Sequence, residues 1–379
     1  MTFAELQEKW SQIRAGVEGE VEKVYELLSS SDEVQVRSSF SLLLSLDECG
    51  LCEVLHDVDG QLRVREDVVV HHRLLWERCI LEEVMIEGSV WHGLYARDCF
   101  ASLEVHILGH TSWDELSESQ QEKVVLESLR SVEVPAGSFM MGALPDDGEA
   151  YDNEKPRHEV TLTKGLLVSQ YPCTQGLYAS VMGTNPSTFV GSMRPVEHVS
   201  WCDAVLFCNK LSEKEGLEAF YILPEPFSND SDWSRKVKWN KSANGYRLLT
   251  EAEWEYCARG REEHLYSGSN DVDEVVWYDG NSGSETHPVG EKKANGYGLY
   301  DMSGNVLEWV FDTYDEYGAY RDPFARDTHD DCASFRVYRG GSWSNIARNV
   351  RVSDRNGDVP SYCYDFLGFR LGRTLPPVP

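Results

Sequence analysis

The stretch that decides the fold is NGYGLYDMSGNVLEW, which spans residues 295–309. Its apolar and aromatic residues come in short runs separated by glycine, asparagine and serine. Runs of this kind are typical of short, irregular strands joined by loops. The same texture begins near Ser131. We therefore expect a domain boundary between Arg130 and Val134, with a second domain over residues 131–379.

Further blocks of the same character follow one another through this second domain. They read VPAGSFMMG (134–142), EKPRHEVTL (154–162), PVEHVSW (195–201), YRLLTEAEWEY (246–256), RGGSW (339–343) and GFRL (368–371). Thr250 is expected to cap a helix that begins at Glu251, with Glu253 in the reciprocal position of a capping box. Gly340 and Gly341 allow a close backbone approach or positive φ angles beside a buried Trp343.

This ordered series closely resembles the formylglycine-generating-enzyme (sulfatase-modifying-factor) family over about residues 131–373. The resemblance implies a C-type-lectin-like core with little regular structure, a small antiparallel sheet, two helices and long loops pinned by aromatic residues. The expected fold class is α+β, in which a helical N-terminal domain precedes a C-type-lectin-like domain.

Residues 1–128 are predicted to form a mostly helical domain of unknown role. Apolar residues recur there at steps of three and four, the period of one helix face. Helices are expected over residues 6–28, 36–46, 74–84, 91–108 and 112–129. For residues 62–70, which follow the pair Asp59-Gly60, a small hairpin and the start of a helix both remain open.

The net charge of −29 limits the kinds of partner. Such a charge repels phosphate backbones, so we expect no nucleic-acid binding, whereas cationic partners and divalent metals are favoured. No basic stretch followed by an apolar run stands at the N-terminus, and no apolar run reaches the roughly 20 residues of a membrane span. The ten cysteines follow no disulfide spacing. A cytoplasmic protein with reduced thiols and no membrane contact is expected.

The catalytic residues implied by the resemblance are missing. Formylglycine-generating enzymes carry two cysteines shortly after the Arg-Gly-Gly-Ser-aromatic block, where they bind copper and activate oxygen. Here Asn345 and Val350 stand at those positions, and neither side chain ligates Cu(I), which selects soft sulfur ligands. Cys363 is the only nearby thiol. We therefore expect no enzyme activity from this domain.

An enzymatic alternative stays open, namely a divergent metal-dependent oxidase or sulfoxide synthase of the same superfamily. The related sulfoxide synthases place an iron site of three histidines in a helical N-terminal domain. His106 and His110 have a spacing that puts both rings on one helix face, and a third histidine would complete such a site. The pair Cys49 and Cys52 has no surrounding βαβ pattern, so we interpret it as structural.

A structural calcium site is the one cofactor that the resemblance implies. Asp301, Gly304, Val306 and Glu308 match a calcium site of the family, which combines side-chain oxygens with backbone carbonyls. The alternative is that Asp301 caps a turn and Glu308 pairs with an arginine.

The segment between Trp343 and Gly368 suggests a function. It reads SNIARNVRVSDRNGDVPSYCYDFL and lacks Lys, Glu, Gln, Met and Trp. Every residue type in it is reachable from the codon AAC by changing adenines, which is the signature of adenine-directed mutagenesis. The segment resembles the variable region of diversity-generating retroelement variable proteins, which use this same fold and end in a similar block. Fixed scaffold positions are expected at Arg348, Arg351, Arg355 and Pro360.

The composition of this segment resembles an antibody paratope, in which tyrosine supplies contact area and short polar residues adapt their hydrogen bonds. The predicted ligand-binding residues are Ser344, Ile346, Asn349, Asp354, Asn356, Asp358, Ser361, Tyr362, Tyr364, Asp365 and Phe366. The expected ligand is a protein or another macromolecule, and the N-terminal domain is expected to couple binding to a protein partner. A fixed-partner interaction module in a signalling or defence assembly and an ordinary surface loop are the alternatives.

Overall fold

A computed structural model describes residues 55–58, 61–64, 81–86, 89–94, 111–314 and 335–375. The chain divides into two compact units, Met1–Glu104 and Val105–Pro379. This division lies earlier in the chain than the boundary expected between Arg130 and Val134. Among the described helices, none is both long enough and apolar enough to span a bilayer.

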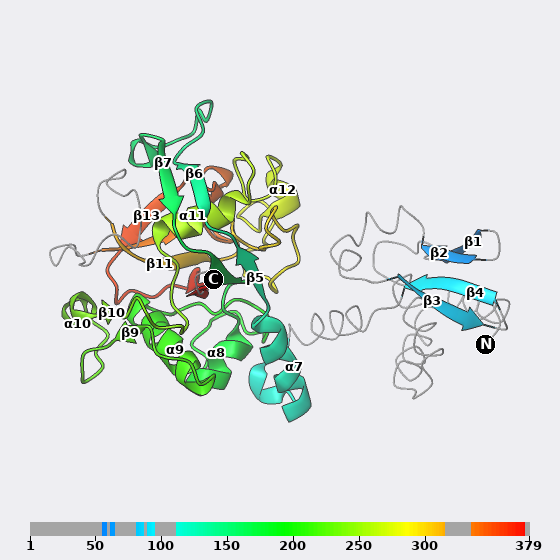
Figure 1. Ribbon diagram of the computed structural model, residues 1–379, viewed down its shortest axis with the longest axis horizontal. Coiled ribbons are helices and arrows are strands. Elements are labelled where there is room, and N and C mark those ends of the chain that lie inside the picture. The colour runs from blue at the N-terminus through cyan, green and yellow to red at the C-terminus, as the bar shows by residue number, and fades with distance from the viewer. Residues whose placement is uncertain are drawn as a thin grey trace. The chain divides into compact units, whose positions relative to one another are not determined.

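The described part of the first unit consists of two hairpins (Figure 1). β1 (Leu55–Val58) pairs antiparallel with β2 (Gln61–Val64), so the hairpin alternative is confirmed there. β3 (Leu81–Ile86) pairs antiparallel with β4 (Ser89–Leu94). The helices expected over residues 74–84 and 91–108 are wrong where these strands lie, because residues 81–86 pair antiparallel with residues 89–94 along their whole length. The other expected helices before residue 111 lie outside the described residues.

The described residues of the second unit begin with the helix predicted over residues 112–129. It consists of η1 (Trp113–Glu115) and α7 (Glu118–Ser128), and Ser117 and Gln120 form a capping box at the start of α7. β5 (Ser131–Val134) then pairs antiparallel with β8 (Leu166–Ser169), which also pairs with β15 (Gly372–Thr374). This three-stranded sheet joins the beginning of the lectin-like domain to its end.

Three more sheets complete the described frame of this unit. β6 (Gly137–Met141) and β7 (His158–Leu162) form a hairpin, and the alternating burial of β7 confirms the strand expected there. The central sheet has the order β13-β12-β11-β14, with all neighbours antiparallel except β11 and β14. Its strands are β11 (Leu307–Thr313), β12 (Arg336–Arg339), β13 (Arg355–Asp358) and β14 (Leu367–Phe369). The short strands β9 (Tyr221–Ile222) and β10 (Lys238–Trp239) pair with each other.

Helices cover this frame. They are α8 (Gln175–Met182), α9 (Trp201–Lys214), α10 (Ser231–Lys236), α11 (Glu251–Arg259) and the short α12 (Val272–Val275), with two 3₁₀ turns at η2 (Asp152–Glu154) and η3 (Ala347–Val350). Thr250 and Glu253 form the predicted capping box of α11. The α+β content and the irregular second domain agree with the expected fold class.

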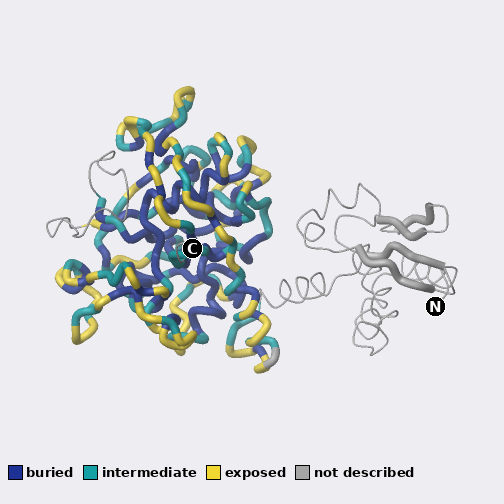
Figure 2. Tube along the Cα trace, in the orientation of Figure 1, coloured by how far each residue is buried: buried dark blue, intermediate teal, exposed yellow. Residues whose placement is uncertain are grey.

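Strand β11 separates two hydrophobic cores, because successive side chains of a strand point to opposite faces. Trp309 and Phe311 join the core that contains α9, whereas Val310 joins the core that contains α11. The indoles of Trp201 and Trp309 are fully buried, and each donates to a backbone carbonyl, of Val310 and Val199 respectively. Burying a large side chain of this kind stabilises a fold by about 2–3 kcal/mol. Figure 2 shows the buried segments in the interior of this unit.

The RGGSW block makes a tight turn. Gly340 and Gly341 have φ angles of 92° and 70°, as expected for left-handed positions. A Cβ atom on Gly341 would lie 2.5 Å from the carbonyl oxygen of Asn349. Trp343 is half-buried, so the expectation of a buried side chain there is wrong. Its indole N–H instead reaches the backbone of Asp365 at the surface segment.

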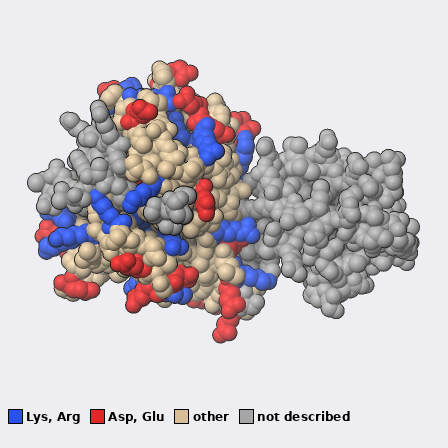
Figure 3. Space-filling view, in the orientation of Figure 1, with Lys and Arg blue, Asp and Glu red and all other residues tan. Residues whose placement is uncertain are grey.

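Acidic and basic side chains alternate on the face of the second unit shown in Figure 3, around an area of uncharged atoms. The negative charge of the chain is therefore not gathered into one patch on this face.

Candidate ligand-binding surface

The predicted binding residues are all accessible. Ser344, Ile346, Asn356 and Tyr362 are exposed, and the other seven are half-buried. The half-buried residues are Asn349, Asp354, Asp358, Ser361, Tyr364, Asp365 and Phe366. The predicted binding positions thus reach the surface at intervals along the segment, whose regular elements are β13 and η3. Between them lie the buried residues Val350, Arg351, Val352, Ser353, Arg355 and Pro360. A surface loop of this kind tolerates changes of side chain that a core would not.

A buried ion pair holds the first part of the segment from below. Arg351 is 2% exposed and donates to both carboxylate oxygens of Glu154, each at 2.7 Å. It also donates to Asp147 at 2.6 Å and to the carbonyl of Arg348 at 2.7 Å. Burial alone would raise the pKa of Glu154, but the hydrogen bonds from Arg351 and Ser353 outweigh this effect and hold that pKa below its ordinary value.

A second buried ion network holds the middle of the segment to α11. Arg355 donates to the two oxygens of Glu251 at 2.7 and 2.8 Å. Arg339 bridges Glu251 and Glu255 at 2.8 and 2.7 Å. Burial raises the pKa of Glu251, and the charges and hydrogen bonds of Arg355 and Arg339 reverse that shift, so the pKa is lowered. The network fixes β13 by charged contacts, whatever side chains its exposed positions carry.

The other two expected scaffold residues behave differently from each other. Pro360 is buried, and its carbonyl accepts from the backbone N–H of Trp201 at the start of α9. Arg348 is 37% exposed, and its guanidinium lies 3.8 Å from the ring centroid of Tyr151. Arg348 therefore stands at the edge of the surface rather than beneath it.

Three aromatic rings form a row at the end of the segment. Tyr362 meets Tyr364 edge-on with centroids 5.9 Å apart, and Tyr364 stacks on Phe366 at 4.9 Å and 9°. The hydroxyl of Tyr364 donates to Asp358 at 3.3 Å. We call Tyr362, Tyr364 and Phe366 the aromatic row. The contacts between its rings give this loop a defined surface.

Sequence reasoning missed the loop that borders the aromatic row. The backbone N–H of His198, which has a φ of 60°, donates to the carbonyl of Tyr364. Thr188 hydrogen-bonds the ring of His198 at 3.0 Å, and Phe189 packs edge-on against Trp343 at 5.3 Å. Val190 is 51% exposed. The one sequence signal for this loop was the apolar pair Phe189-Val190 after a proline and polar residues. This pair does not indicate which part of the chain the loop contacts.

Beneath this border lies a buried acid. Glu197 accepts from the backbone N–H groups of Thr188 and Phe189, and its carboxylate lies 3.3 Å from the His198 ring. Burial raises the pKa of Glu197 to about 7 despite these hydrogen bonds. Its carboxyl group thus orders the bordering loop from the inside.

The residues of the expected calcium site form a different arrangement. Asp301, Gly304, Val306 and Glu308 are all buried. The two oxygens of Glu308 accept from Arg370 at 3.0 to 3.2 Å, and one also accepts from Trp254 at 2.6 Å. This is the arginine pairing given above as the alternative. The residues do not fit a calcium site of the expected kind, since a cation would compete with the Arg370 guanidinium for Glu308. Calcium binding stays a prediction.

Asp301 has its own internal partners. Its carboxylate accepts from the backbone N–H of Gly290 at 2.7 Å, and burial raises its pKa to about 6. Within the ranges that the structure describes, no group of three or more His, Cys, Asp or Glu residues is placed to hold a metal ion.

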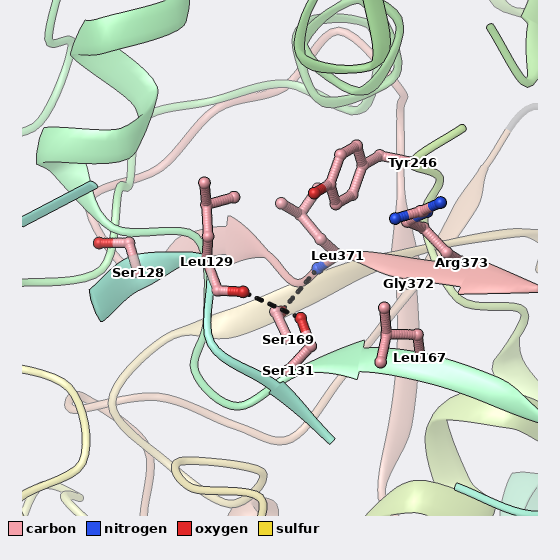
Figure 4. Close-up of a pocket in the computed structure, with 9 residues that line it drawn as sticks. All are labelled: Ser128, Leu129, Ser131, Leu167, Ser169, Tyr246, Leu371, Gly372 and Arg373. Carbon is pink, nitrogen blue, oxygen red and sulfur yellow. Dashed lines mark hydrogen bonds between the residues drawn. The ribbon is translucent and has the colours of Figure 1, made fainter. Parts of the chain in front are cut away.

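A small cavity lies where α7 leads into β5, beside β8 and β15 (Figure 4). Its volume is about 10 Å³, which suits a single water molecule. It is lined by Ser128, Leu129, Ser131, Leu167, Ser169, Tyr246, Leu371, Gly372 and Arg373. This cavity is too small to admit a substrate.

Comparison with known proteins decides the family. The family model of the sulfatase-modifying factor enzyme 1-like domain matches residues 116–375, which is more than half of the chain. The chain belongs to this family. The resemblance drawn from the sequence blocks is confirmed.

The relatives of this sulfatase-modifying factor enzyme 1-like domain include a variable protein, a chaperone protein and an inactive protein as well as enzymes. The solved structure of Treponema denticola variable protein 1 is 34% identical, covers 65% of this chain and 95% of its own, and has a TM-score of 0.58. The chaperone protein LppX of Paenibacillus barcinonensis is 36% identical over 56% of this chain and 84% of its own length. The mouse inactive C-alpha-formylglycine-generating enzyme 2 is 28% identical over 63% of this chain and 84% of its own length. Formylglycine-generating enzymes match too, so family membership alone leaves activity open.

In this member of the sulfatase-modifying factor enzyme 1-like family, Asn345 and Val350 stand where the resemblance places the enzymes' two cysteines. Both residues make contacts that support the fold. The side-chain oxygen of Asn345 accepts from the backbone N–H and the hydroxyl of Ser342, and Val350 is buried in a small core. Cys363 is exposed, whereas the other described cysteines, at 173, 202, 208 and 257, are buried. His106, His110, Cys49 and Cys52 lie outside the described residues.

Proposed function

We propose that this protein binds a ligand through a variable C-terminal surface, in the manner of a diversity-generating retroelement variable protein. The observation that carries the proposal is that the eleven residues predicted to bind are exposed or half-buried, while Arg351 and Arg355, which stand between them in the sequence, are buried in ion pairs. Surface substitutions away from buried features change stability by about 0.5 kcal/mol or less. The four exposed positions, Ser344, Ile346, Asn356 and Tyr362, are therefore free to vary without loss of the fold.

The similarity to Treponema denticola variable protein 1 supports this proposal. The ligand is proposed to be a protein or another macromolecule, because the surface is open and the segment spans more than twenty residues, from Ser344 to Phe366. The N-terminal unit would couple binding to a protein partner. A cytoplasmic location is part of the proposal and follows from the sequence arguments alone.

Peptide selection tests the proposed binding surface. A random peptide library would be panned against the full chain, and the selected peptides titrated against two variants. One variant replaces the aromatic row by Y362A/Y364A/F366A, and its control, L126A/I222A, removes apolar side chains that are exposed elsewhere. We expect the selected peptides to lose at least tenfold in affinity for the first variant and none for the control. Equal affinity for both variants would refute the proposal.

Two alternatives make different predictions. A divergent oxidase or sulfoxide synthase should purify with stoichiometric iron or copper. This alternative stays open because formylglycine-generating enzymes are among the matched relatives. A fixed-partner module should lack two features of the flanking DNA, namely a reverse transcriptase gene and a near-identical repeat with adenines at the codons of residues 344–366. Metal analysis and sequencing of the flanking DNA separate these alternatives from the proposal.

A further inference from the structure

We propose that the aromatic row, together with Asp358 and Asp365, is a docking face for a cationic segment of a partner protein, which it recognises through arginine or lysine side chains. This inference rests on the proposed function and specifies the chemistry of the ligand.

The rings of the aromatic row are available to a cation. Tyr362 is 48% exposed, and Tyr364 and Phe366 are half-buried against the α9 core. A guanidinium or ammonium group over such a ring is stabilised by the negative face of the π system. Elsewhere in this fold arginines already use that contact, as Arg348 does over Tyr151 and Arg355 over Tyr314. Within the described residues, no lysine or arginine lies over the rings of the aromatic row.

The charges around the aromatic row are negative. Burial raises the pKa of Tyr364, and the nearby carboxylate of Asp358 raises it further. Burial, and next the charge of Asp203, also raises the pKa of the Cys363 thiol. Cys363 lies between Tyr362 and Tyr364 in the sequence. A cation that docks here would be attracted by Asp358 and Asp203, whereas a phosphate or a nucleic acid would be repelled.

Two of the three arginines of the same segment do not cancel this negative charge at the surface, and the third, Arg348, is paired with Glu149. Arg351 and Arg355 are buried, and each is paired with a buried glutamate of the frame. Asp358 forms hydrogen bonds with Tyr364 and the backbone N–H of Val359, and neither donor is charged. In the part of the chain that the structure describes, Asp365 forms no ion pair. Two carboxylates beside the aromatic row thus remain open to a cationic partner.

The border of the aromatic row offers an apolar contact for the residues beside such a cation. Trp343 donates to the carbonyl of Asp365 and packs against Phe189. Val190, which follows Phe189 in the chain, is 51% exposed. An arginine or lysine side chain could lay its methylene groups along such an apolar rim while its charged head meets Asp365. Aromatic rings, carboxylates and an apolar rim together favour a basic peptide segment over a small inorganic cation.

Titration with charged peptides tests the inference. A fluorescein-labelled peptide of four Arg-Gly repeats and a matched peptide of four Glu-Gly repeats would be titrated by fluorescence anisotropy at about 0.15 M salt, where distant surface charges are screened. The full chain would be compared with D358N/D365N and with D114N/E115Q, which removes the same charge from exposed residues of η1. We expect the arginine peptide to bind at least tenfold more weakly to D358N/D365N and equally well to the η1 control. An equal loss in both variants, or equal binding of the glutamate peptide, would overturn the inference.

The composition of the selected peptides distinguishes this inference from the proposed function. Peptides that depend on the aromatic row and are enriched in arginine or lysine support both. Peptides that depend on the row without such enrichment leave the proposed function standing and overturn the cationic docking face. Peptides that bind without the row overturn both.

Discussion

Replacement of Arg351 by methionine should destabilise the second unit far more than replacement of any exposed arginine. Methionine keeps most of the side-chain volume and removes the guanidinium, so Glu154 and Asp147 lose their shared buried partner. Breaking a buried ion pair by removal of one partner costs about 3–5 kcal/mol. Arg348, which is 37% exposed beside an exposed Glu149, provides the control, and loss of its surface pair should cost about 0–1 kcal/mol.

The size of this loss should depend on pH, because Glu154 without its partner would take up a proton. Protonation of a carboxyl group with an ordinary pKa of 4.5 at pH 7 costs about 1.4 kcal/mol for each pH unit above that value, or about 3.4 kcal/mol. The lowered pKa of Glu154 means that its ion pair stabilises the fold above pH 4.5 and that this stabilisation disappears as the pH falls through the folded-state pKa. The deficit of Arg351→Met should therefore shrink to about 1–2 kcal/mol at pH 5.

Urea denaturation followed by tryptophan fluorescence measures both effects, since Trp201, Trp254 and Trp309 are fully buried in the second unit. The unfolding midpoints of Arg351→Met and Arg348→Met would be compared with the unchanged chain at pH 7 and at pH 5. If the two variants differ by less than about 1 kcal/mol at pH 7, the ion pair does not hold the frame as argued. A deficit of Arg351→Met that is independent of pH would show that lost contacts, rather than the charge left on Glu154, cause the loss.

Four further outcomes follow from the same geometry. Burial, and next the charge of Glu154, raises the pKa of Asp354 to about 7. The protonated carboxyl group therefore stabilises the fold at low pH, and this stabilisation is lost as the pH rises through that value. In urea titrations, Asp354→Asn should stabilise the fold at pH 8 by on the order of 1–3 kcal/mol, and by less at pH 5. Gly341→Ala meets the carbonyl of Asn349 and should cost about 2 kcal/mol more than Gly183→Ala, which has a similar φ and open space, as measured by thermal unfolding. Ile346→Ser should change the unfolding midpoint by about 0.5 kcal/mol or less, because the side chain is exposed. Addition of 1 mM calcium after EDTA treatment should shift the melting temperature by less than about 1 °C, whereas a larger rise would show that a calcium site forms despite the arginine pairing.

The sequence predicted the second domain better than the first for a physical reason. Capping residues and left-handed glycines are local signals, so Thr250 with Glu253 and the pair Gly340 and Gly341 were correctly assigned without knowledge of their neighbours. Strands β3 and β4 carry no such local signal. Their short apolar runs satisfy a helical spacing as well as a strand, and only pairing across the hairpin separates the two.

The candidate site shows the same difference between signals that are local in the sequence and contacts that form only in the folded chain. The composition of one continuous segment, with its short polar residues and tyrosines, predicted the ligand-binding residues. These residues are exposed or half-buried, and their binding of a ligand stays a prediction. The loop at Phe189 and the ring of His198 reach this segment only through the folded chain. The same holds for Arg355 and Glu251, which lie 104 residues apart in the sequence. Their pairing depends on where β13 lies against α11, and no pattern in the sequence predicts that position.

The buried arginines explain how one scaffold could carry many binding surfaces. An apolar side chain beneath a loop holds it through shape, so a change in its neighbours alters the fit of the whole core. An arginine that is bidentate to a buried glutamate fixes both distance and direction by itself. Arg351 and Arg355 therefore hold the backbone of the segment at two points, while its exposed side chains at Ser344, Ile346, Asn356 and Tyr362 contribute little to stability. This arrangement requires that charged groups are removed from water, and a buried carboxylate that loses its arginine is left without a partner. The loss of one such arginine should therefore destabilise the fold more than the simultaneous replacement of several exposed residues.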